Sequence, residues 1–260
     1  MAGRMNGDVA VVTGGGRGIG RAIATAYARE GASVVVTARS TEEIDAVVTD
    51  ITARGGRALA VRGDITSDED VVELRARCES EIGPCNVLVN NAGRYGPNRF
   101  LDYSLEEFQA IVDVNVIGTV RVIREFLPGM LERGSGRVLN IASTAGKYGS
   151  LFQSAYNTSK HGVVGLTRCL ALETASAGVR VNAICPGFVE TEMIDDALPK
   201  FAEIFGMEPE QTEQALLSRV PIGRFLKPEE IADLALFLGS KEGDGVTGQA
   251  YTISGGLIQA

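Results

Sequence analysis

Short apolar runs alternate with longer amphipathic stretches along most of the 260-residue chain. The runs predict strands over Val9–Thr13, Ser33–Thr37, Ala58–Arg62, Val87–Asn90, Arg137–Ala142, Val179–Ile184 and Ala250–Ser254. The stretches predict helices over about Gly18–Glu30, Thr41–Arg54, Ser67–Glu81, Leu105–Glu132, Gln153–Ser176 and Pro228–Leu238. Consecutive apolar residues within a strand, as in Val34–Val36, are typical of parallel strands covered on both faces. The pattern therefore predicts an α/β fold: about seven parallel strands, doubly wound, with helices on both faces.

One irregular insertion, about residues 188–220, follows the sixth predicted strand. It is rich in Phe, Met, Ile and Leu, and Pro199 and Pro209 interrupt it. Because ligands of doubly wound sheets bind beyond the carboxyl ends of the strands, we expect a helical substrate lid here. Two surface helices packed on each other are the alternative. No linker or repeat interrupts the rest, so we expect one domain over residues 1–260.

Charge and composition exclude several kinds of protein. The chain carries 25 Lys and Arg against 33 Asp and Glu, a net charge of −8, so we expect no nucleic-acid partner. Its four cysteines and single histidine lack the spacing of metal ligands, so we expect no metal and reduced thiols. There is no apolar leader in Met1–Asp8 and no run of 18 apolar residues, so we expect a cytoplasmic protein without a membrane partner.

The first predicted strand runs into a glycine-rich loop, Thr13–Gly20, which precedes a helix. Glycines let backbone amides approach a pyrophosphate, which the amino-terminal end of the helix also attracts. Gly14, Gly18 and Gly20 form a GxxxGxG pattern between strand and helix. This context predicts the dinucleotide site of a single Rossmann domain.

The end of the second predicted strand indicates which dinucleotide binds. A site that prefers NAD usually carries an acid there for the ribose 2′-hydroxyl. Val36–Ser40 contains no acid, but it contains Arg39, and Arg17 lies in the glycine loop. Two guanidinium groups can pair with a 2′-phosphate, so the sequence favours NADP(H).

The chain resembles the classical short-chain dehydrogenase/reductase family over essentially its entire length. The motifs that carry the resemblance are Thr13–Gly20, Asp64, Asn90–Gly93, Asn115, Ser143, Tyr156–Lys160 and Pro186–Thr191. The resemblance adds further cofactor-binding residues to Gly14, Arg17, Gly18, Gly20 and Arg39, namely Ile19, Asp64, Ile65, Asn91, Ala92, Gly93, Tyr156, Lys160, Pro186, Gly187, Val189 and Thr191. It implies that Asp64 and Ile65 lie near the adenine and that Val189 and Thr191 hold the carboxamide.

Within the family, the chain is similar to bacterial 3-oxoacyl reductases and to actinorhodin-type aromatic polyketide ketoreductases. The similar stretches are residues 140–147, 159–165, 185–191 and 219–224. The chain differs where those ketoreductases carry Pro-Gly-Gly after the NNAG motif, because it has Arg94-Tyr95-Gly96-Pro97.

Tyr156 and Lys160 are four residues apart, so on a helix they share one face. A cation about 4 Å away, at an effective dielectric of about 20, contributes about 4 kcal/mol to ionising a phenol, before desolvation opposes it. We therefore expect Lys160 to lower the pKa of Tyr156 toward working pH, as general acid–base chemistry requires. His161 is turned about 100° from this face and is expected to have a structural or interface role rather than a catalytic one.

The resemblance implies catalytic roles for Asn115, Ser143, Tyr156 and Lys160. Tyr156 would protonate the developing alkoxide and Ser143 would donate a hydrogen bond to it. Lys160 would hold the nicotinamide ribose, and Asn115 would support a water-linked proton path to Lys160.

These features predict an NADP(H)-dependent oxidoreductase that reduces an apolar cyclic or β-keto substrate, acyl or polyketide, free or carrier-bound. A secondary alcohol dehydrogenase working oxidatively and a non-catalytic nucleotide sensor are the alternatives. The helix predicted over Gln153–Ser176 has apolar residues on more than one face, so we expect a homo-oligomer, first a tetramer and second a dimer.

Overall fold

The computed structural model of this protein describes residues 3–259; Met1, Ala2 and Ala260, which belong to the predicted domain, lie outside them. The described residues form one parallel sheet of seven strands in the order β3-β2-β1-β4-β5-β6-β7. The strands are β1 Val9–Thr13, β2 Ser33–Ala38, β3 Arg57–Arg62, β4 Val87–Asn90, β5 Gly136–Ile141, β6 Val179–Pro186 and β7 Ala250–Ile253. Each predicted strand is confirmed to within two residues at either end.

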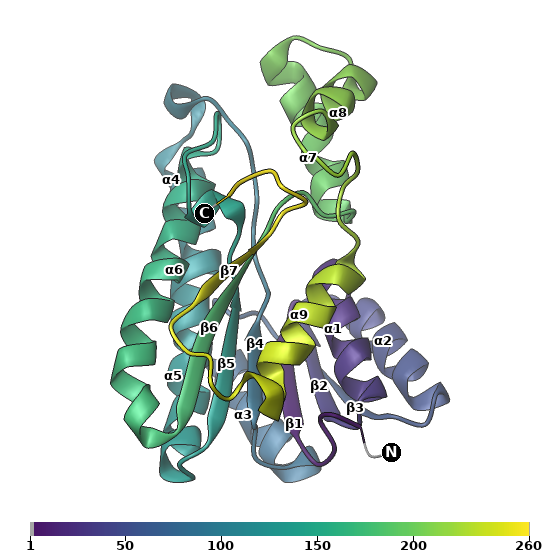
Figure 1. Cartoon of the computed structure of the whole chain (residues 1–260), viewed down its shortest axis with the longest axis vertical. Coiled ribbons are helices and arrows are strands. Elements are labelled where there is room, and N and C mark those ends of the chain that lie inside the picture. The colour runs from purple at the N-terminus through teal and green to yellow at the C-terminus, as the bar shows by residue number, and fades with distance from the viewer. Residues whose placement is uncertain (1–2, 260) are drawn as a thin grey trace.

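Helices cover both faces of this sheet, as predicted (Figure 1). One face carries α1 Gly18–Arg29, α2 Thr41–Ala53 and α9 Pro228–Gly239. The other carries α3 Asp68–Arg77, α5 Thr119–Glu132 and α6 Ser154–Thr174, and α4 Leu105–Val112 packs against α6. Each layer has its own apolar core against the sheet, centred on Tyr27 in the first and Met130 in the second, both fully buried. The doubly wound fold class is therefore confirmed.

The strand order places the binding crevice. After β3 at one edge, the chain returns to the centre of the sheet and β4 pairs with β1, with Val12 opposite Val89. Such a reversal opens a crevice at the carboxyl ends of the two strands. The glycine-rich loop leaves β1 there, and the Asn90–Gly93 motif leaves β4 beside it. Topology thus brings together two motifs that are about 75 residues apart in the sequence.

The long helix predicted over Leu105–Glu132 is interrupted. Between α4 and α5 lies a π-helical turn, Asp113–Gly118, that holds Asn115. Such turns contain an extra residue, and they often occur at functional sites. Here the side chain of Asn115 binds the backbone of Arg94 outside the helix. That contact is non-local, so helical periodicity does not indicate it.

A chain of buried polar groups fixes α6 to the sheet. Asn90 on β4 donates to Asn140 on β5 at 2.9 Å, and Asn140 donates to Thr167 on α6 at 2.9 Å. All three side chains are at most 4% exposed. Because unpaired polar groups are costly in such surroundings, these bonds define how α6 lies on the sheet.

The insertion after β6 forms two helices, α7 Glu192–Phe205 and α8 Pro209–Leu217. They stand beyond the carboxyl ends of the strands (Figure 1). Phe201, Leu216 and Phe225 form a small apolar core of their own there. The predicted helical character is confirmed. None of the helices in residues 3–259 has the length and apolarity needed to cross a bilayer.

Candidate active site

A cavity of about 140 Å³, here called the inner cavity, lies at the carboxyl ends of β4, β5 and β6. Ten of the predicted site residues line it: Ile19, Asn91, Gly93, Ser143, Tyr156, Lys160, Pro186, Gly187, Val189 and Thr191. Phe188, Met193, Ile194 and Arg219 of the predicted lid also line it, whereas Tyr95, Tyr148 and Gln153 in its lining were not predicted as site residues. The structure thus brings three of the four predicted catalytic residues into one cavity.

Tyr156 and Lys160 face this cavity from the first turns of α6. The Lys160 ammonium lies 5.5 Å from the centroid of the Tyr156 ring. Lys160 Nζ donates a hydrogen bond of 2.8 Å to the carbonyl of Ile141, at the end of β5. Ser143 follows that strand, and its hydroxyl accepts the backbone N–H of Ala145. The shared helix face predicted for Tyr156 and Lys160 is confirmed.

The predicted effect on Tyr156 is wrong for this structure. Protein atoms around the phenol exclude water, and this burial raises the pKa of Tyr156 to about 12. A hydrogen bond with Ser143 lowers it, but by less. Burial also lowers the pKa of Lys160 to about 8. The sequence-based expectation rested on the attraction between the two groups, whereas burial is the largest influence on the pKa of each group here.

Asn115 does not contact Lys160 directly. Its amide donates to the Arg94 carbonyl at 2.9 Å and to the Ser159 hydroxyl at 2.9 Å, and its oxygen accepts the Arg94 N–H at 2.7 Å. Gly93 lies between Asn115 and Lys160. A Cβ atom added to Gly93 would stand 3.3 Å from Asn115 Oδ1 and 3.8 Å from Lys160 Nζ. The absence of a side chain at Gly93 keeps the space between the two groups free.

The glycine-rich loop packs directly against the β4 motif. Gly14 has φ +59°, and a Cβ there would lie 2.8 Å from the Ala92 Cα. The Asn91 amide donates to the carbonyls of Thr13 and Gly14 at 3.1 and 2.9 Å. Backbone at this end of the crevice is therefore available to a pyrophosphate beside α1, as the motif predicts. Thr13, the first residue of the predicted loop, also holds the two motifs together, because its hydroxyl accepts the N–H groups of Asn91 and Ala92.

Arg17 and Arg39 line a second cavity, of about 520 Å³, here called the outer cavity. Gly93, Tyr95 and Met193 line both cavities, so the two are neighbours. Two cations thus lie at one end of a groove whose other end holds Tyr156, which suits a dinucleotide with an additional phosphate. Glu43 of α2 lies 4.0 Å from Arg17, at ion-pair distance.

Asp64 and Ile65 lie at different depths. Asp64 accepts the backbone N–H of Thr66 at 2.9 Å and its hydroxyl at 2.7 Å. Partial burial of Asp64 raises its pKa, but those bonds and the charges of Arg39 and Arg62 outweigh this and lower it overall. Ile65 is 8% exposed, and its side chain occupies the space that a Cβ on Gly118 would enter.

His161 lies outside both cavities. Its ring Nδ1 is 2.9 Å from the Asn157 carbonyl of the preceding turn. His161 is also exposed, so the structural or interface role expected for it stays a prediction.

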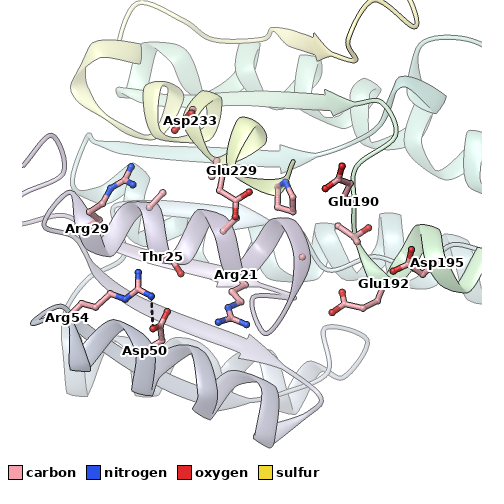
Figure 2. Close-up of a pocket in the computed structure, with 16 residues that line it drawn as sticks. Arg21, Thr25, Arg29, Asp50, Arg54, Glu190, Glu192, Asp195, Glu229 and Asp233 are labelled. Atoms are coloured by element: carbon pink, nitrogen blue, oxygen red, sulfur yellow. Dashed lines mark hydrogen bonds and ion pairs between the residues drawn. The ribbon is translucent and has the colours of Figure 1, made fainter. Parts of the chain in front are cut away.

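A third depression, of about 640 Å³, lies elsewhere, along α1 between α2 and α9 (Figure 2). Arg21 and Arg29 project from α1, and Glu190, Glu192 and Asp195 stand at one end (Figure 2). These side chains are exposed and of mixed charge. No group of three or more His, Cys, Asp or Glu within residues 3–259 is arranged to hold a metal ion. The inner cavity, with its converging polar groups, is the better candidate.

The chain belongs to the short chain dehydrogenase family, whose pattern matches residues 8–200. A Streptomyces coelicolor protein assigned as a ketoacyl reductase is 40% identical, over 96% of this chain and 97% of its own length. A 3-oxoacyl-(acyl-carrier-protein) reductase of Thermotoga maritima is 36% identical, over 98% of this chain and 99% of its own length. Among solved structures, an actinorhodin polyketide ketoreductase with NADPH superposes with a TM-score of 0.94, at 39% identity, over 99% of both chains. The predicted family resemblance is confirmed.

The burial of Lys160 predicts how stability depends on pH. Below pH 8 the folded and unfolded proteins both hold the Lys160 proton, so the full cost of burying the charge opposes folding. Between pH 8 and 10.5 the folded protein releases this proton while the unfolded protein retains it, so stability rises. Relative to Lys160→Met, the parent protein should gain about 3 kcal/mol of unfolding free energy between pH 7 and 10.5.

Urea unfolding at several pH values measures this difference. Lys227→Met, the same change at an exposed position, is the control. Relative to this control, the parent protein should gain no unfolding free energy between pH 7 and 10.5. A difference between the parent and Lys160→Met that stays constant with pH would contradict the buried charge.

Proposed function

We propose that this protein is an NADP(H)-dependent ketoreductase. The observation that carries the proposal is the convergence of Ser143, Tyr156 and Lys160 in a cavity that adjoins a groove suited to a dinucleotide. The similarity to reductases of 3-oxoacyl and polyketide ketones supports it. A nucleotide sensor has no need of these three groups at one end of the groove.

The residues fit NADP(H) along the groove. The backbone of the Gly14–Gly20 loop would hold the pyrophosphate, and Arg17 and Arg39 would pair with the 2′-phosphate. Asp64 and Ile65 would lie toward the adenine. Lining residues of the inner cavity, with Ala92 of the β4 motif, would surround the nicotinamide half: Ile19, Asn91, Gly93, Pro186, Gly187, Val189 and Thr191. When bound, NADPH supplies the hydride that the carbonyl carbon receives.

The protein's own groups act at the carbonyl oxygen. Ser143 and Tyr156 would both donate hydrogen bonds to it as negative charge develops there. With a pKa of about 12, Tyr156 is neutral at pH 7 and still a stronger acid than an alcohol, whose pKa is close to the value of about 15.7 for water. Proton transfer from Tyr156 to an alkoxide is therefore downhill. The raised pKa keeps Tyr156 in the protonated form that donates to the carbonyl oxygen during reduction.

Lys160 would stabilise the phenolate that this transfer leaves and would contact the nicotinamide ribose. Its ammonium already lies beside the Tyr156 ring. Asn115 would act through the space beside Gly93, where a water molecule would link it to Lys160. These roles are proposals that rest on the placement of the groups.

The substrate would be an apolar cyclic or β-keto compound, acyl or polyketide. Phe188 and Ile194 give the inner cavity apolar walls, and they belong to the insertion of residues 188–220, which we propose acts as the lid of a domain spanning 1–260. The insertion carries more acids than bases, which disfavours direct contact between the lid and an anionic carrier arm. We place the enzyme in the cytoplasm.

We also propose a homotetramer. On α6, Val163 and Ala171 pack inward, but Cys169 and Leu172 remain exposed, Leu172 by 85%. A second copy of the chain would cover this outward apolar face.

Replacing Tyr156 by Phe tests the proposed acid. Loss of general acid catalysis should lower kcat for ketone reduction about 10²- to 10⁴-fold, because the ring remains but the proton donor is gone. NADPH affinity, measured by fluorescence titration, should change little. Tyr251→Phe removes a hydroxyl from the exposed β7 and should keep full activity. Unchanged turnover by Tyr156→Phe would rule out this role.

Replacing Arg39 by Ala tests the cofactor choice. Loss of a charge-assisted bond should raise KM for NADPH about 10- to 100-fold, while KM for NADH stays nearly constant. Arg54→Ala, at the far end of α2, serves as the matched control. An equal loss with both cofactors would mean that Arg39 does not contact the 2′-phosphate.

Leu172→Glu tests the proposed assembly. A charge in a buried apolar contact should convert the tetramer to a smaller species in size-exclusion chromatography with light scattering. Val72→Glu on α3, also exposed, should leave the mass unchanged. A Leu172→Glu protein with the parent's mass would exclude this face as an interface.

A further inference from the structure

Tyr95 occupies the boundary between the inner and outer cavities. Only Gly93, Tyr95 and Met193, within the described residues, line both. Gly93 has no side chain, and Met193 is 41% exposed with a flexible, unbranched side chain. The aromatic ring of Tyr95 is therefore the rigid part of the partition.

Two aromatic contacts hold this ring in place. Its centroid lies 4.6 Å from that of Tyr156, with the planes at 90°, an edge-to-face arrangement. On the lid side it lies 6.3 Å from Phe201 of α7, which is 1% exposed. Tyr95 thus spans the distance between the proposed proton donor and the small apolar core under the lid.

The backbone on either side of Tyr95 is also fixed. The side chain of Asn115 binds both the N–H and the carbonyl of Arg94. The hydroxyl of Tyr103 donates to the carbonyl of Gly96. Two residues further on, Asn98 N–H donates to the Phe152 carbonyl at 2.8 Å, just before α6. With both neighbouring residues anchored, the backbone of Tyr95 cannot easily shift to admit a larger ligand, and the contacts with Tyr156 and Phe201 restrict the ring.

The phenol oxygen of Tyr95 has no hydrogen-bond partner among residues 3–259. Its ring contacts account for its position without the hydroxyl. A role that depends on the bulk of the ring is therefore favoured over one that depends on the oxygen.

The two cavities that the Tyr95 ring separates differ in volume. The inner cavity, at about 140 Å³, is small beside the roughly 300–1,000 Å³ of ordinary small-molecule sites, and the nicotinamide must share it. The outer cavity is about 520 Å³, and part of its lining is apolar and buried, through Pro97, Ile111 and Ala197. NADP(H) would occupy the part of this cavity beside Arg17 and Arg39, and without the Tyr95 ring a ketone bound at Tyr156 would extend into the part beside Pro97, Ile111 and Ala197.

We propose that Tyr95 determines substrate size, closing the inner cavity so that only ketones with one ring or a short acyl chain reach Ser143 and Tyr156. The inference rests on the proposed ketoreductase function and adds the size class of its substrate. Asn115 acts here as a positioning residue, through the backbone of Arg94.

Reduction of cyclohexanone and of 2-tetralone by NADPH tests this inference, with kcat/KM measured for each. The parent protein should prefer the one-ring ketone. Tyr95→Ala should raise the ratio of two-ring to one-ring kcat/KM at least about tenfold, the scale on which pocket shape discriminates substrates. Tyr95→Leu, which keeps apolar contact with Phe201, should shift the ratio in the same direction and serves if the alanine protein does not fold. Thermal melting checks the fold of each.

Tyr95→Phe is the matched control and should keep the parent's ratio, because the ring remains. Tyr95→Ala and Tyr95→Leu proteins that lose activity equally toward both ketones would overturn the inference, since Tyr95 would then only support Tyr156. The inference would also be overturned if Tyr95→Phe changed the ratio of two-ring to one-ring kcat/KM as much as Tyr95→Ala does. In those cases the proposed ketoreductase function stands. A parent protein that does not oxidise NADPH with either ketone or with a β-keto ester would overturn both the proposed function and the role of Tyr95.

Discussion

The removal of water from an amine and a phenol on one helix face is the constraint on which the site depends. Lys160 is 5% exposed and its ammonium lies beside the Tyr156 ring, so each group is in an environment that disfavours its charge. Burial keeps Tyr156 protonated and brings the pKa of Lys160 close to physiological pH. A neutral acid and a labile cation, side by side, suit a reaction in which an oxygen gains charge and then a proton.

The fold provides the framework that makes this burial possible. The buried bonds from Asn90 to Asn140 and on to Thr167 hold α6 against the sheet, and the Ile141 carbonyl at the end of β5 accepts from Lys160. The reversal of strand order at β1 and β4 opens the crevice at the same edge. The groove that suits the dinucleotide and the proton donor therefore share one end of the sheet.

Features set by neighbouring residues could be predicted from the sequence. Strand positions, the glycine-rich loop and the common face of Tyr156 and Lys160 depend on periodicity and spacing. The pair of arginines also depends on local position, one in the glycine loop and one at the end of β2.

Features set by contacts across the fold could not be predicted from the sequence. The pKa of Tyr156 depends on which elements cover it, and the spacing of four residues does not contain that information. The π-helical turn at Asn115 depends on the backbone of Arg94, 21 residues away. The position of Tyr95 between two cavities depends on α7, about 100 residues further along the chain. In each case the missing quantity is the three-dimensional surroundings of a side chain rather than its identity.

Direct titration of the Lys160 ammonium by NMR tests the central claim. The chain has only five lysines, so a lysine-labelled sample gives few signals, and Lys160→Arg assigns the one of interest. The account predicts that this signal titrates near pH 8, well below the ordinary lysine value of about 10.5. A Lys160 signal that titrates at 10.5 or above would show that the site does not exclude water from the pair, and the account would be wrong.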